Sequence, residues 1–584
     1  MLLQLAFLKS AQTIHDVAFL LDFQAKALAY ILYKKPPEAK YRSFTIAKRT
    51  GGIREINAPS EDLMLLQTKL SELLQNCAQE LKVTQKWEDQ LAHGFKRERS
   101  IISNASKHLK RRHVFNVDLQ DFFGTINFGR LRGFFIKDKN FALQPAVATI
   151  LAQIACHNNA LPQGSPCSPV ISNLVGHILD VHLCKLASQN GCTYSRYADD
   201  LTFSTSEREF PPVIAKRGEA APHIWEVGDV LQKVVNRSGF VINPQKTRMQ
   251  YRTSRQDVTG LVVNKKVNVR IEYRRRVRAM ANRLFMKGRF DIIRTLPNDA
   301  GELVPTPTEG TLTQLHGMLG HIDAVDRHNM RLRKEEYGER SEKDLSSKET
   351  LYRRFLIFKE FYAASEPVIV CEGKTDTVYL TQAIRNMAVR YPVLAKVSPD
   401  GKVALSVRMF KYPPTSTSEI LRLTGGADVL NDFAWDYLRE IKRFKAPGKQ
   451  QPLIFVVDND SGAKSICGSA KNLAKKDARK ELFLHLSENL YLVVLPLLQE
   501  KPESEIEDFV GAQIRGIKLD GKTFSPKGDS DSNFGKHVLA QYIEKNAQKF
   551  DFTGLAPILD RISAAIQMHY ARHPAPELTA ATKV

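Results

Sequence analysis

The chain has 584 residues, more than a single hydrophobic core usually serves, so roughly two to four domains are expected. Hydrophobic residues make up 43% and charged residues 25% of the chain, which excludes a mostly disordered protein. The 85 Lys and Arg residues exceed the 63 Asp and Glu residues by 22, and this excess predicts a polyanionic partner, either nucleic acid or an anionic membrane.

The first predicted element is an amphipathic helix and not a signal peptide. The opening run MLLQLAFLKSAQTIHDVAFLLDF has no basic start, and Gln4, Lys9 and His15 interrupt it at helical spacing. No segment approaches the roughly 18 consecutive apolar residues of a membrane-spanning helix, so no membrane partner is expected. The seven cysteines are scattered without a CxxC pair, which argues against a disulfide framework or zinc knuckle and favours a reducing cytoplasm. Nucleic acid is therefore the expected partner.

Aspartates stand at predicted strand ends in the first half of the chain. Asp118 follows the β-prone run HVFNV, and Asp199 and Asp200 lie in the turn YADD between the runs TYSR and LTFST. Adjacent carboxylates repel each other and desolvate poorly, but a pair of divalent cations removes that objection. Two-metal phosphoryl transfer needs oxygen ligands from separate segments that hold the ions roughly 3.5–4 Å apart. These aspartates therefore predict a two-metal site, with the turn LPQGSP at residues 161–166 between its two halves.

The order of these motifs resembles that of reverse transcriptases over roughly the first 330 residues. The resemblance implies a right-hand fold of fingers, palm and thumb, and two Mg²⁺ ions bound by Asp118, Asp199 and Asp200. It assigns Phe123 to the aromatic residue that screens the sugar of the incoming dNTP. It also assigns Gln163 and Gly164 to the turn that packs against the templating base pair.

Further segments extend this resemblance to the fingers, the palm and the thumb. Lys48, Arg49 and Arg54 resemble the fingers segment that grips the triphosphate. Residues 239–246, which end in Lys246, match the motif that follows YADD, and residues 315–325 resemble the thumb. Taken singly, Arg54 and Lys246 are equally well explained as surface charges.

Two short strings resemble those of bacterial retron reverse transcriptases. Asn104 to His108 fit the pattern NAxxH, with Asn104 and His108 as the fixed residues, and Val258, Thr259 and Gly260 fit the pattern VTG. The resemblance implies that the residues of these two strings take part in recognising a cognate structured noncoding RNA. It also implies priming from the 2′-hydroxyl of an internal guanosine, which gives a branched RNA–DNA product. A helix cap is the alternative role for Asn104.

The basic excess is concentrated between Tyr251 and Phe290, with twelve Lys and Arg residues against two Asp and Glu residues. Arg274, Arg275 and Arg278 lead into a helical pattern whose positive face would follow phosphates. A solvated surface helix is the alternative for a charge run of this kind.

After Pro367 the composition changes to that of an α/β fold. The runs PVIVCEG and PLIFVVDND are β-branched and end in acidic residues, which predicts buried parallel strands. Because the carboxyl ends of parallel strands face one crevice, Glu372, Asp458 and Asp460 are expected to share a metal ion. Their oxygen ligands suit Mg²⁺ or Mn²⁺. A strand-capping acidic turn is the alternative.

Over roughly residues 366–540 these motifs resemble a Toprim domain, whose pattern is Glu-Gly after one strand and DxD after a later one. Additional residues resemble the accessory acidic and lysine elements of overcoming-lysogenization-defect nucleases, which cleave nucleic acid with two metals. These residues are Asp376, Glu505, Glu507 and Lys536. The sequence leaves open which acidic residue among 505, 507 and 508 is a ligand.

Together these patterns predict a multidomain α+β and α/β protein. A right-hand reverse transcriptase is expected over residues 1–335 and a charged linker with a connecting helix over residues 336–366. A Rossmann-like Toprim domain with a C-terminal helical region is expected over residues 367–584. The oligomeric state and the nuclease substrate do not follow from the sequence.

The expected function is that of a retron RNA-directed DNA polymerase coupled to a Toprim metallonuclease effector in antiphage defence, in the bacterial cytoplasm. Its expected partners are the noncoding RNA, the branched product and dNTPs. One alternative is a group II intron or diversity-generating reverse transcriptase with a Toprim domain. The other is a Toprim scaffold that only binds nucleic acid.

Overall fold

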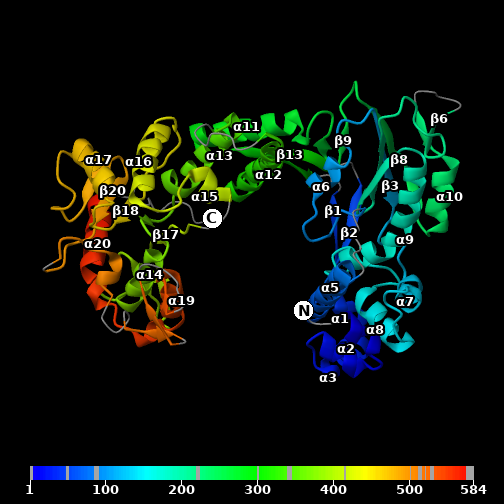
Figure 1. Ribbon diagram of the computed structural model, residues 1–584, viewed down its shortest axis with the longest axis horizontal. Helices are drawn as coiled ribbons and strands as arrows, with labels where there is room; N and C mark the ends of the chain where they lie inside the picture. The colour runs from blue at the N-terminus through cyan, green and yellow to red at the C-terminus, as the bar shows by residue number, and fades with distance from the viewer. Residues whose placement is uncertain are drawn as a thin grey trace. The chain divides into compact units, whose positions relative to one another are not determined.

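The structure is a computed structural model that describes residues 4–47, 52–84, 91–218, 224–298, 302–337, 345–412, 416–499, 501–510, 516–519, 521–525 and 532–573. The chain divides into two compact units (Figure 1). The first comprises Met1–Arg274, Ile293–Thr306 and Ala324–Arg340. The second comprises Arg275–Ile292, Pro307–Asp323 and Ser341–Val584. Helix α11 (Ile271–Lys287) and helix α12 (Leu312–Tyr337) each contribute residues to both units.

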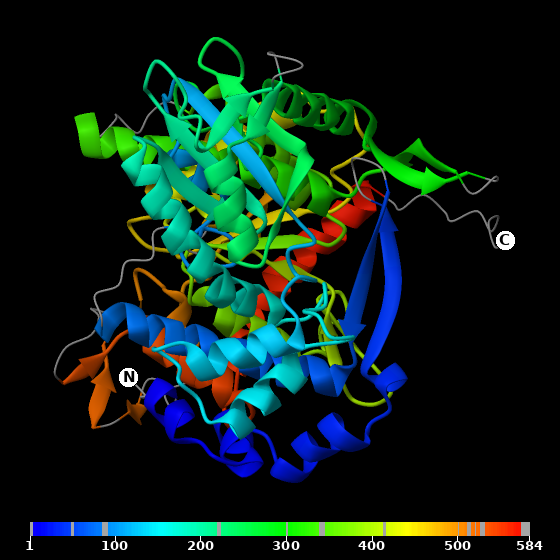
Figure 2. The ribbon, with the colours of Figure 1, turned by 90° about the vertical axis from the view of Figure 1, so that its right-hand side faces the viewer.

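The predicted N-terminal amphipathic helix is divided into α1 (Gln4–Ser10) and α2 (Ile14–Leu20). The break occurs because Thr13 and Asp16 form a capping box that starts a new helix. Helix α3 (Ala25–Ala29) and the π-helical turn η1 (Tyr30–Lys34) follow, and the short α4 (Pro37–Lys40) leads into a hairpin. This antiparallel hairpin of β1 (Tyr41–Ala47) and β2 (Ile53–Pro59) is the long blue ribbon in Figure 2.

A four-stranded antiparallel sheet forms the centre of the first unit. Its order is β4 (Thr193–Tyr197), β5 (Asp200–Thr205), β3 (His113–Gln120) and β8 (Val241–Tyr251). Its core includes apolar residues of α5 (Glu61–Thr84), α7 (Phe128–Lys137), α8 (Pro145–Ala155), α9 (Ser168–Gln189) and α10 (Asp229–Arg237). Among the described helices, only α9 has the length and mean hydropathy of a membrane span, and 61% of that stretch is buried inside the protein.

Smaller elements complete the first unit around this sheet. Helix α6 (Ile101–Ser106) precedes β3, and β6 (Ala215–Arg217) pairs with β7 (Trp225–Val227). A three-stranded sheet has the order β11 (Asn268–Val269), β10 (Leu261–Val262) and β9 (Asp257–Val258). The hairpin of β12 (Asp291–Pro297) and β13 (Leu303–Glu309) connects α11 to α12. The predicted thumb segment at residues 315–325 is helical, as part of α12, and its residues up to Asp323 belong to the second unit.

The second unit contains the predicted parallel strands. Its sheet has the order β17 (Arg408–Met409), β14 (Val368–Cys371), β18 (Leu453–Val457), β20 (Leu490–Val494) and β19 (Leu484–Ser487). The first four strands are parallel, and β19 pairs with β20 in the antiparallel direction. The α/β architecture predicted from the two β-branched runs is thereby confirmed.

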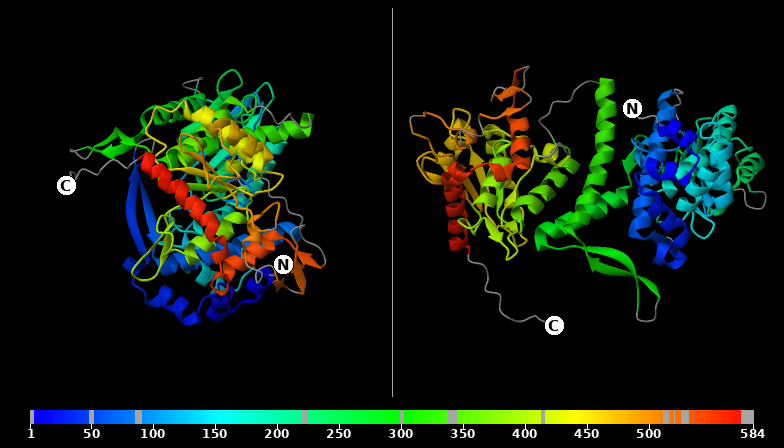
Figure 3. Two further views of the ribbon diagram at one scale, coloured as in Figure 1. Left: turned by 90° about the vertical axis from the view of Figure 1, so that its left-hand side faces the viewer. Right: turned by 90° about the horizontal axis from the view of Figure 1, so that it is seen from below.

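Alternate residues of these strands face two different helical layers. Ile369 and Ile454 share a core with α14 (Asp376–Asn386), α19 (Lys536–Lys545) and α20 (Ala556–Arg572), the red helix in Figure 3. On the opposite side, the ring of Phe455 lies 6.2 Å from that of Phe433 on α16 (Ala427–Ile441). Because both faces of these strands are buried, both strands read as continuous apolar runs.

Shorter elements of the second unit join these layers. They are β15 (Ala395–Val397), β16 (Val403–Leu405), α15 (Ser416–Leu421), α17 (Lys464–Ala474), β21 (Lys518–Leu519), β22 (Lys522–Phe524) and β23 (Asn533–Phe534). Three 3₁₀ turns, η3 (Ile506–Asp508), η4 (Ala547–Lys549) and η5 (Thr553–Leu555), complete the described elements.

The described part of the predicted linker differs from a solvated connection. Residues 345–366 contain α13 (Ser347–Ile357) and the π-helical turn η2 (Phe358–Tyr362). Phe355 and Phe358 are buried, and Arg353 and Arg354 form ion pairs of 2.5 and 2.6 Å with acidic residues of α16. The segment therefore belongs to the core of the second unit, because its apolar residues recur at helical spacing.

Candidate functional site

The aspartates predicted at strand ends meet on neighbouring strands of the first unit. Asp118 on β3 is the register partner of Asp200, which begins β5. The backbone N–H of Leu119 donates to the carbonyl oxygen of Asp199 at 3.0 Å, which ties the YADD turn to β3. The local β-propensity of three separate runs builds these strands, and their pairing brings the carboxylates together.

Lys246, predicted as part of the same site, contacts Asp118 directly. Its Nζ lies 2.9 and 3.0 Å from the two carboxylate oxygens of Asp118, a side chain that is almost fully buried. The hydrogen bond to Asp118 raises the pKa of the Lys246 ammonium. Lys246 is therefore more than a surface charge, because it neutralises the least accessible carboxylate of the cluster.

Desolvation, followed by mutual repulsion, governs the pKa values of the other two aspartates. Asp200 lies at the exposed rim of the turn, yet loss of bulk water around its carboxyl and the charges of Asp199 and Asp118 raise its pKa to about 6. Desolvation, followed by the charge of Asp118, also raises the pKa of Asp199, while Lys246 and Arg54 oppose that rise. Arg54, on the β2 hairpin strand, is thus close enough to act on the carboxylate cluster.

This cluster fits a divalent cation by the chemistry of its donors. In the described part of the chain, no three Asp, Glu, His or Cys side chains stand in a ready coordinating arrangement. Carboxylate oxygens are nevertheless the ligands that Mg²⁺ prefers, and a cation would relieve the repulsion that raises the pKa values of Asp199 and Asp200. The residues that would hold it are Asp118, Asp199 and Asp200.

Three other predicted residues of this site, Phe123, Gln163 and Gly164, lie in packed positions. The Phe123 ring is half-buried, 5.6 Å from the ring of Phe122. The carbonyl of Gln163 accepts a hydrogen bond of 2.8 Å from the backbone N–H of Asn57, and Gly164 has φ +120°. A side chain on Gly164 would meet the Asn57 carbonyl, so this turn needs glycine to pack on β2. Lys48 and Arg49 lie outside the described residues.

The segment His93-Gly94-Phe95, which the sequence analysis did not single out, also supports the YADD turn. The backbone N–H of His93 donates to the carbonyl of Arg196 at 2.8 Å. A Cβ on Gly94 would lie 2.7 Å from the backbone nitrogen of Ala198, so only glycine allows this approach. The available signal was a glycine between aromatic side chains, just ahead of the basic run KRER.

The NAxxH residues are structural, which corrects the prediction that Asn104 and His108 contact RNA. Both side chains are fully buried. The two ring nitrogens of His108 each lie 2.7 Å from a serine hydroxyl, of Ser204 on β5 and of Ser195 on β4, and Ser195 also donates to Asn104 at 2.6 Å. Burial lowers the pKa of His108 to about 3, so the ring is neutral. The motif therefore joins α6 to the strands beside the YADD turn.

The VTG residues lie against the same helix. Val258 is fully buried, which excludes a direct RNA contact by its side chain. The Thr259 hydroxyl donates to the carbonyl of Ile101 on α6 at 3.2 Å, and Gly260 is exposed with φ +82°. The two strings thus form one packed contact between segments about 150 residues apart in the chain. An RNA contact remains a prediction for Thr259 and Gly260.

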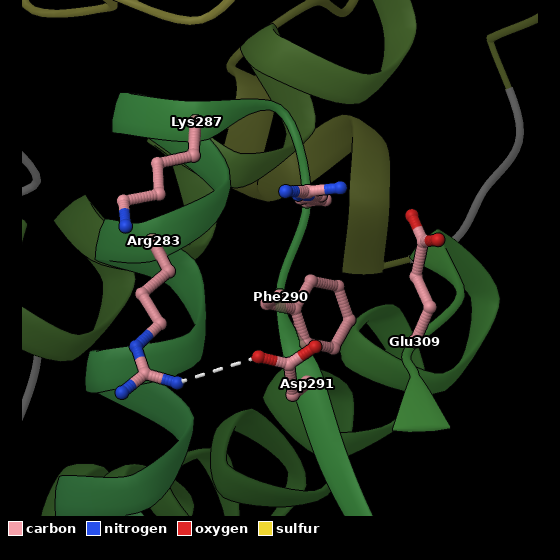
Figure 4. Close-up of a pocket in the computed structure, with 6 residues that line it drawn as sticks. Arg283, Lys287, Phe290, Asp291 and Glu309 are labelled. Atoms are coloured by element: carbon pink, nitrogen blue, oxygen red, sulfur yellow. Dashed lines mark ion pairs between the residues drawn. The ribbon is translucent and has the colours of Figure 1, made fainter. Parts of the chain in front are cut away.

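The predicted basic helix is present as α11. Its apolar positions Val277, Met280, Ala281 and Leu284 are buried, whereas Arg275 and Arg278 are exposed and Arg274 is half-buried. At its C-terminal end, a cavity of about 490 Å³ is lined by Arg283, Lys287, Arg289, Phe290, Asp291 and Glu309 (Figure 4). Contact with phosphates remains a prediction for this helix.

A second acidic cluster lies at the carboxyl ends of two adjacent parallel strands. Glu372 follows β14 and Asp458 follows β18. The backbone N–H of Asp458 donates to Glu372 Oε2 at 3.1 Å. Burial raises the pKa of Glu372, and the charge of Asp460 adds to the rise. The predicted residues Glu372, Asp458 and Asp460 are therefore close together.

Accessory residues surround Asp458. Burial, and then the charges of Asp376, Glu372 and Glu507, raise the pKa of Asp458 to about 8. Burial also raises the pKa of Asp376 to about 6. Lys536 Nζ lies 3.1 Å from Glu505 and 3.2 Å from the buried Glu507. The carboxylate oxygens of this acidic cluster are a donor set that fits Mg²⁺ or Mn²⁺.

Among the acidic residues near 505, Glu507 is the one that acts on this cluster. Its charge raises the pKa values of both Asp376 and Asp458. Asp508 instead pairs with Lys501 at 2.7 Å and accepts a hydrogen bond from the backbone N–H of Glu505. The sequence left this choice open because all three residues fall within one short acidic run.

The first half of the chain is similar in sequence to known proteins. Residues 46–269 match the sequence model of the family described as "Reverse transcriptase (RNA-dependent DNA polymerase)". The Retron Mx65 reverse transcriptase of Myxococcus xanthus is 34% identical over 286 residues, which cover 46% of this chain and 62% of that protein. The Retron Ec86 reverse transcriptase of Escherichia coli is 29% identical over 275 residues, which cover 47% of this chain and 78% of that protein.

The chain thus spans less than two thirds of the length of the Mx65 relative. Among solved structures, telomerase from Candida albicans in complex with a fragment of telomeric RNA is 10% identical, with a TM-score of 0.29. That match covers 54% of this chain and 63% of the telomerase chain, and its TM-score is too low to support an argument.

Proposed function

We propose that the chain is an RNA-directed DNA polymerase of the retron type, with a reverse-transcriptase domain over residues 46–269, which match the sequence model of that family. In this proposal it binds a structured noncoding RNA and copies part of it from dNTPs into branched RNA–DNA. The observation that carries the proposal is the convergence of Asp118, Asp199 and Asp200 on paired strands beside Lys246.

The residues of the chain have separate roles in this reaction. The three aspartates hold Mg²⁺, which when bound stabilises the charge that develops during phosphoryl transfer. Arg54 supplies a positive charge near Asp199 and is suited to the triphosphate of the incoming dNTP. Lys246 balances the charge of Asp118, and Phe123 limits the space for the sugar.

We expect Asp199→Asn to abolish DNA synthesis on the cognate RNA while RNA affinity stays within about twofold, because the carboxylates serve chemistry and basic surfaces serve affinity. Primer extension and filter binding on the same preparation measure both quantities. A matched control is Asp229→Asn, since Asp229 is exposed at the start of α10. Full-length product from Asp199→Asn would reject the polymerase assignment.

For the second unit, we propose a Toprim metallonuclease that uses Mg²⁺ or Mn²⁺. The support is a parallel sheet whose adjacent strands β14 and β18 end in Glu372 and Asp458, with Asp376, Glu507 and Lys536 around them. In antiphage defence in the bacterial cytoplasm, the branched product would restrain or arm this nuclease until infection disturbs it.

Two experiments distinguish the proposed function from its alternatives. A noncoding RNA with inverted repeats that copurifies with the protein favours the retron, whereas a neighbouring intron or variable repeat favours the group II intron or diversity-generating alternative. If the second unit only binds nucleic acid, no metal-dependent cleavage is detected. If it is a nuclease, Glu372→Ala eliminates the cleavage, because a ligand and its charge are removed.

A further inference from the structure

A buried ion pair lies behind the YADD turn. Arg196 directly precedes the turn on β4, Asp180 lies on α9, and neither side chain is exposed to solvent. Nε and Nη2 of Arg196 each donate to one carboxylate oxygen of Asp180 at 2.7 Å. A bidentate pair of this kind fixes the plane and direction of the guanidinium.

The third nitrogen of the guanidinium reaches the turn itself. Nη1 of Arg196 donates to the carbonyl oxygen of Ala198 at 3.1 Å. Ala198 has φ +57° and occupies the first central position of a two-residue turn between the paired residues Tyr197 and Asp200. This left-handed conformation favours glycine, so an alanine persists there only when its surroundings hold it.

Neighbouring groups enclose this arrangement. Asn173 accepts from Nη1 of Arg196 at 3.3 Å and donates to the carbonyl of Gly94 at 2.7 Å. Gly94 in turn approaches the backbone of Ala198 too closely for any side chain. On α9, a Cβ at Gly176 would lie 2.9 Å from Nη2 of Arg196. The guanidinium and the turn backbone are therefore held by a continuous set of contacts.

We infer that Arg196 is a positioning residue: clamped by Asp180, it holds the Ala198 carbonyl and thereby sets the direction of the Asp199 carboxylate. This inference rests on the polymerase function proposed above. Folding stability alone does not explain the pair, because well-packed apolar residues often replace a buried ion pair without loss of stability. No apolar side chain, however, can donate to the Ala198 carbonyl.

The test compares the full-length protein with the double variant R196M/D180L, which replaces the pair by apolar side chains. In the folded double variant, we expect kcat for RNA-templated DNA synthesis to fall at least about tenfold. We expect the Mg²⁺ concentration for half-maximal rate to rise at least about threefold, with the KM for dNTP and RNA affinity unchanged. In metal-free protein, hydrogen exchange of the peptide over residues 194–202 should be faster than in the parent.

The matched control is Tyr194→Phe. The Tyr194 hydroxyl donates to the same Asp180 oxygen at 2.8 Å, and removing this hydroxyl would leave the bond from Arg196 to the Ala198 carbonyl in place. We expect parental kcat, Mg²⁺ requirement and exchange rate for this variant. A Mg²⁺ requirement shifted as far as that of R196M/D180L would overturn the inference.

Other outcomes also decide the question. Parental kcat and Mg²⁺ requirement in folded R196M/D180L would show that the pair serves folding only. If the double variant does not fold, Arg196→Lys replaces it, since lysine keeps the charge but lacks the planar fork. An unchanged Mg²⁺ requirement in its folded fraction would overturn the inference. If the unsubstituted protein makes no DNA on an RNA template, the proposed function is rejected instead. Hydrogen exchange over residues 194–202 still tests whether Arg196 positions the turn.

Discussion

At the scale of single residues, both acidic clusters combine close carboxylates with one lysine ammonium. Lys246 neutralises the buried Asp118 in the first unit, and Lys536 lies between Glu505 and Glu507 in the second. Burial of the remaining carboxylates, and then their mutual repulsion, raise the pKa to about 6 for Asp200 and to about 8 for Asp458. Each cluster is therefore strained electrostatically when its carboxylates ionise without a bound cation.

This strain predicts how stability depends on pH for Asp458. Its pKa is about 8 in the folded protein and near 3.8 when unperturbed, so the folded state binds the proton more tightly. The resulting stabilisation is complete below about pH 4 and is lost as the pH rises to about 8. Without divalent cations, we expect Asp458→Asn to melt at least about 3 °C above the parent at pH 8.5 and close to it at pH 4.

Thermal melting of the second unit in chelator, at both pH values, measures this effect. Asp432→Asn is the matched control, because Asp432 is exposed on α16 of the same unit. The control should show the same difference from the parent at both pH values. A variant at Asp458 that is less stable than the parent at pH 8.5 would contradict the prediction.

At the scale of elements, two motifs of the first half differ in what they do. Helix α6 is joined to β4 and β5 through the buried His108. Helix α11 instead buries one apolar stripe and exposes Arg275 and Arg278. One element therefore supports the YADD strands from inside, whereas the other offers positive charge to a polyanion.

This difference predicts opposite effects of two substitutions. We expect His108→Ala to lower stability by about 2–3 kcal/mol, because the buried hydroxyls of Ser204 and Ser195 both lose their hydrogen bond to the imidazole, and to leave the salt dependence of RNA binding unchanged. We expect Arg275→Ala to keep the parental melting temperature and to reduce the slope of log K against log salt by about 1.

Melting curves and RNA titrations at several salt concentrations test both variants. Lys396→Ala, an exposed cation of β15, serves as the control for nonspecific charge loss. If His108→Ala had parental stability and a smaller slope of log K against log salt, His108 would contact RNA directly, contrary to what its burial indicates.

At the scale of the whole molecule, the chain carries two acidic sites in two compact units. Asp118, Asp199 and Asp200 belong to the first unit, and Glu372, Asp458 and Asp460 belong to the second. A polymerase alone has no need for the second cluster. In the proposed function, the nucleic acid made at the first site controls the activity of the second.

This arrangement predicts different losses for two variants in cells. We expect Asp458→Ala to make branched DNA at the parental level but to give no protection against phage, because only the nuclease site has lost a ligand. We expect Asp199→Asn to give neither DNA nor protection, because the controlling product is missing. DNA yield and plaque counts, measured side by side, test both. Full protection by Asp458→Ala would place the effector outside the second unit.

Elements whose signals are local could be predicted from the amino-acid sequence. β-prone and β-branched runs predicted β3, β14 and β18, and the acidic residues that follow these runs predicted sites at Asp118, Glu372 and Asp458. These signals are readable because strand formation and turn chemistry depend mainly on neighbouring residues.

Which side chains are buried, and which partners they contact, follows from the packing of the folded chain and could not be predicted from the sequence. In the folded chain His108 lies between two strands, and Arg196 forms an ion pair with Asp180. The charge of Glu507, and not that of Asp508, acts on Asp458 in the second cluster. A charged residue in the same local sequence pattern can be exposed in one place and buried in another. What separates them is desolvation and contact between segments far apart in the chain, and neither is encoded in local periodicity.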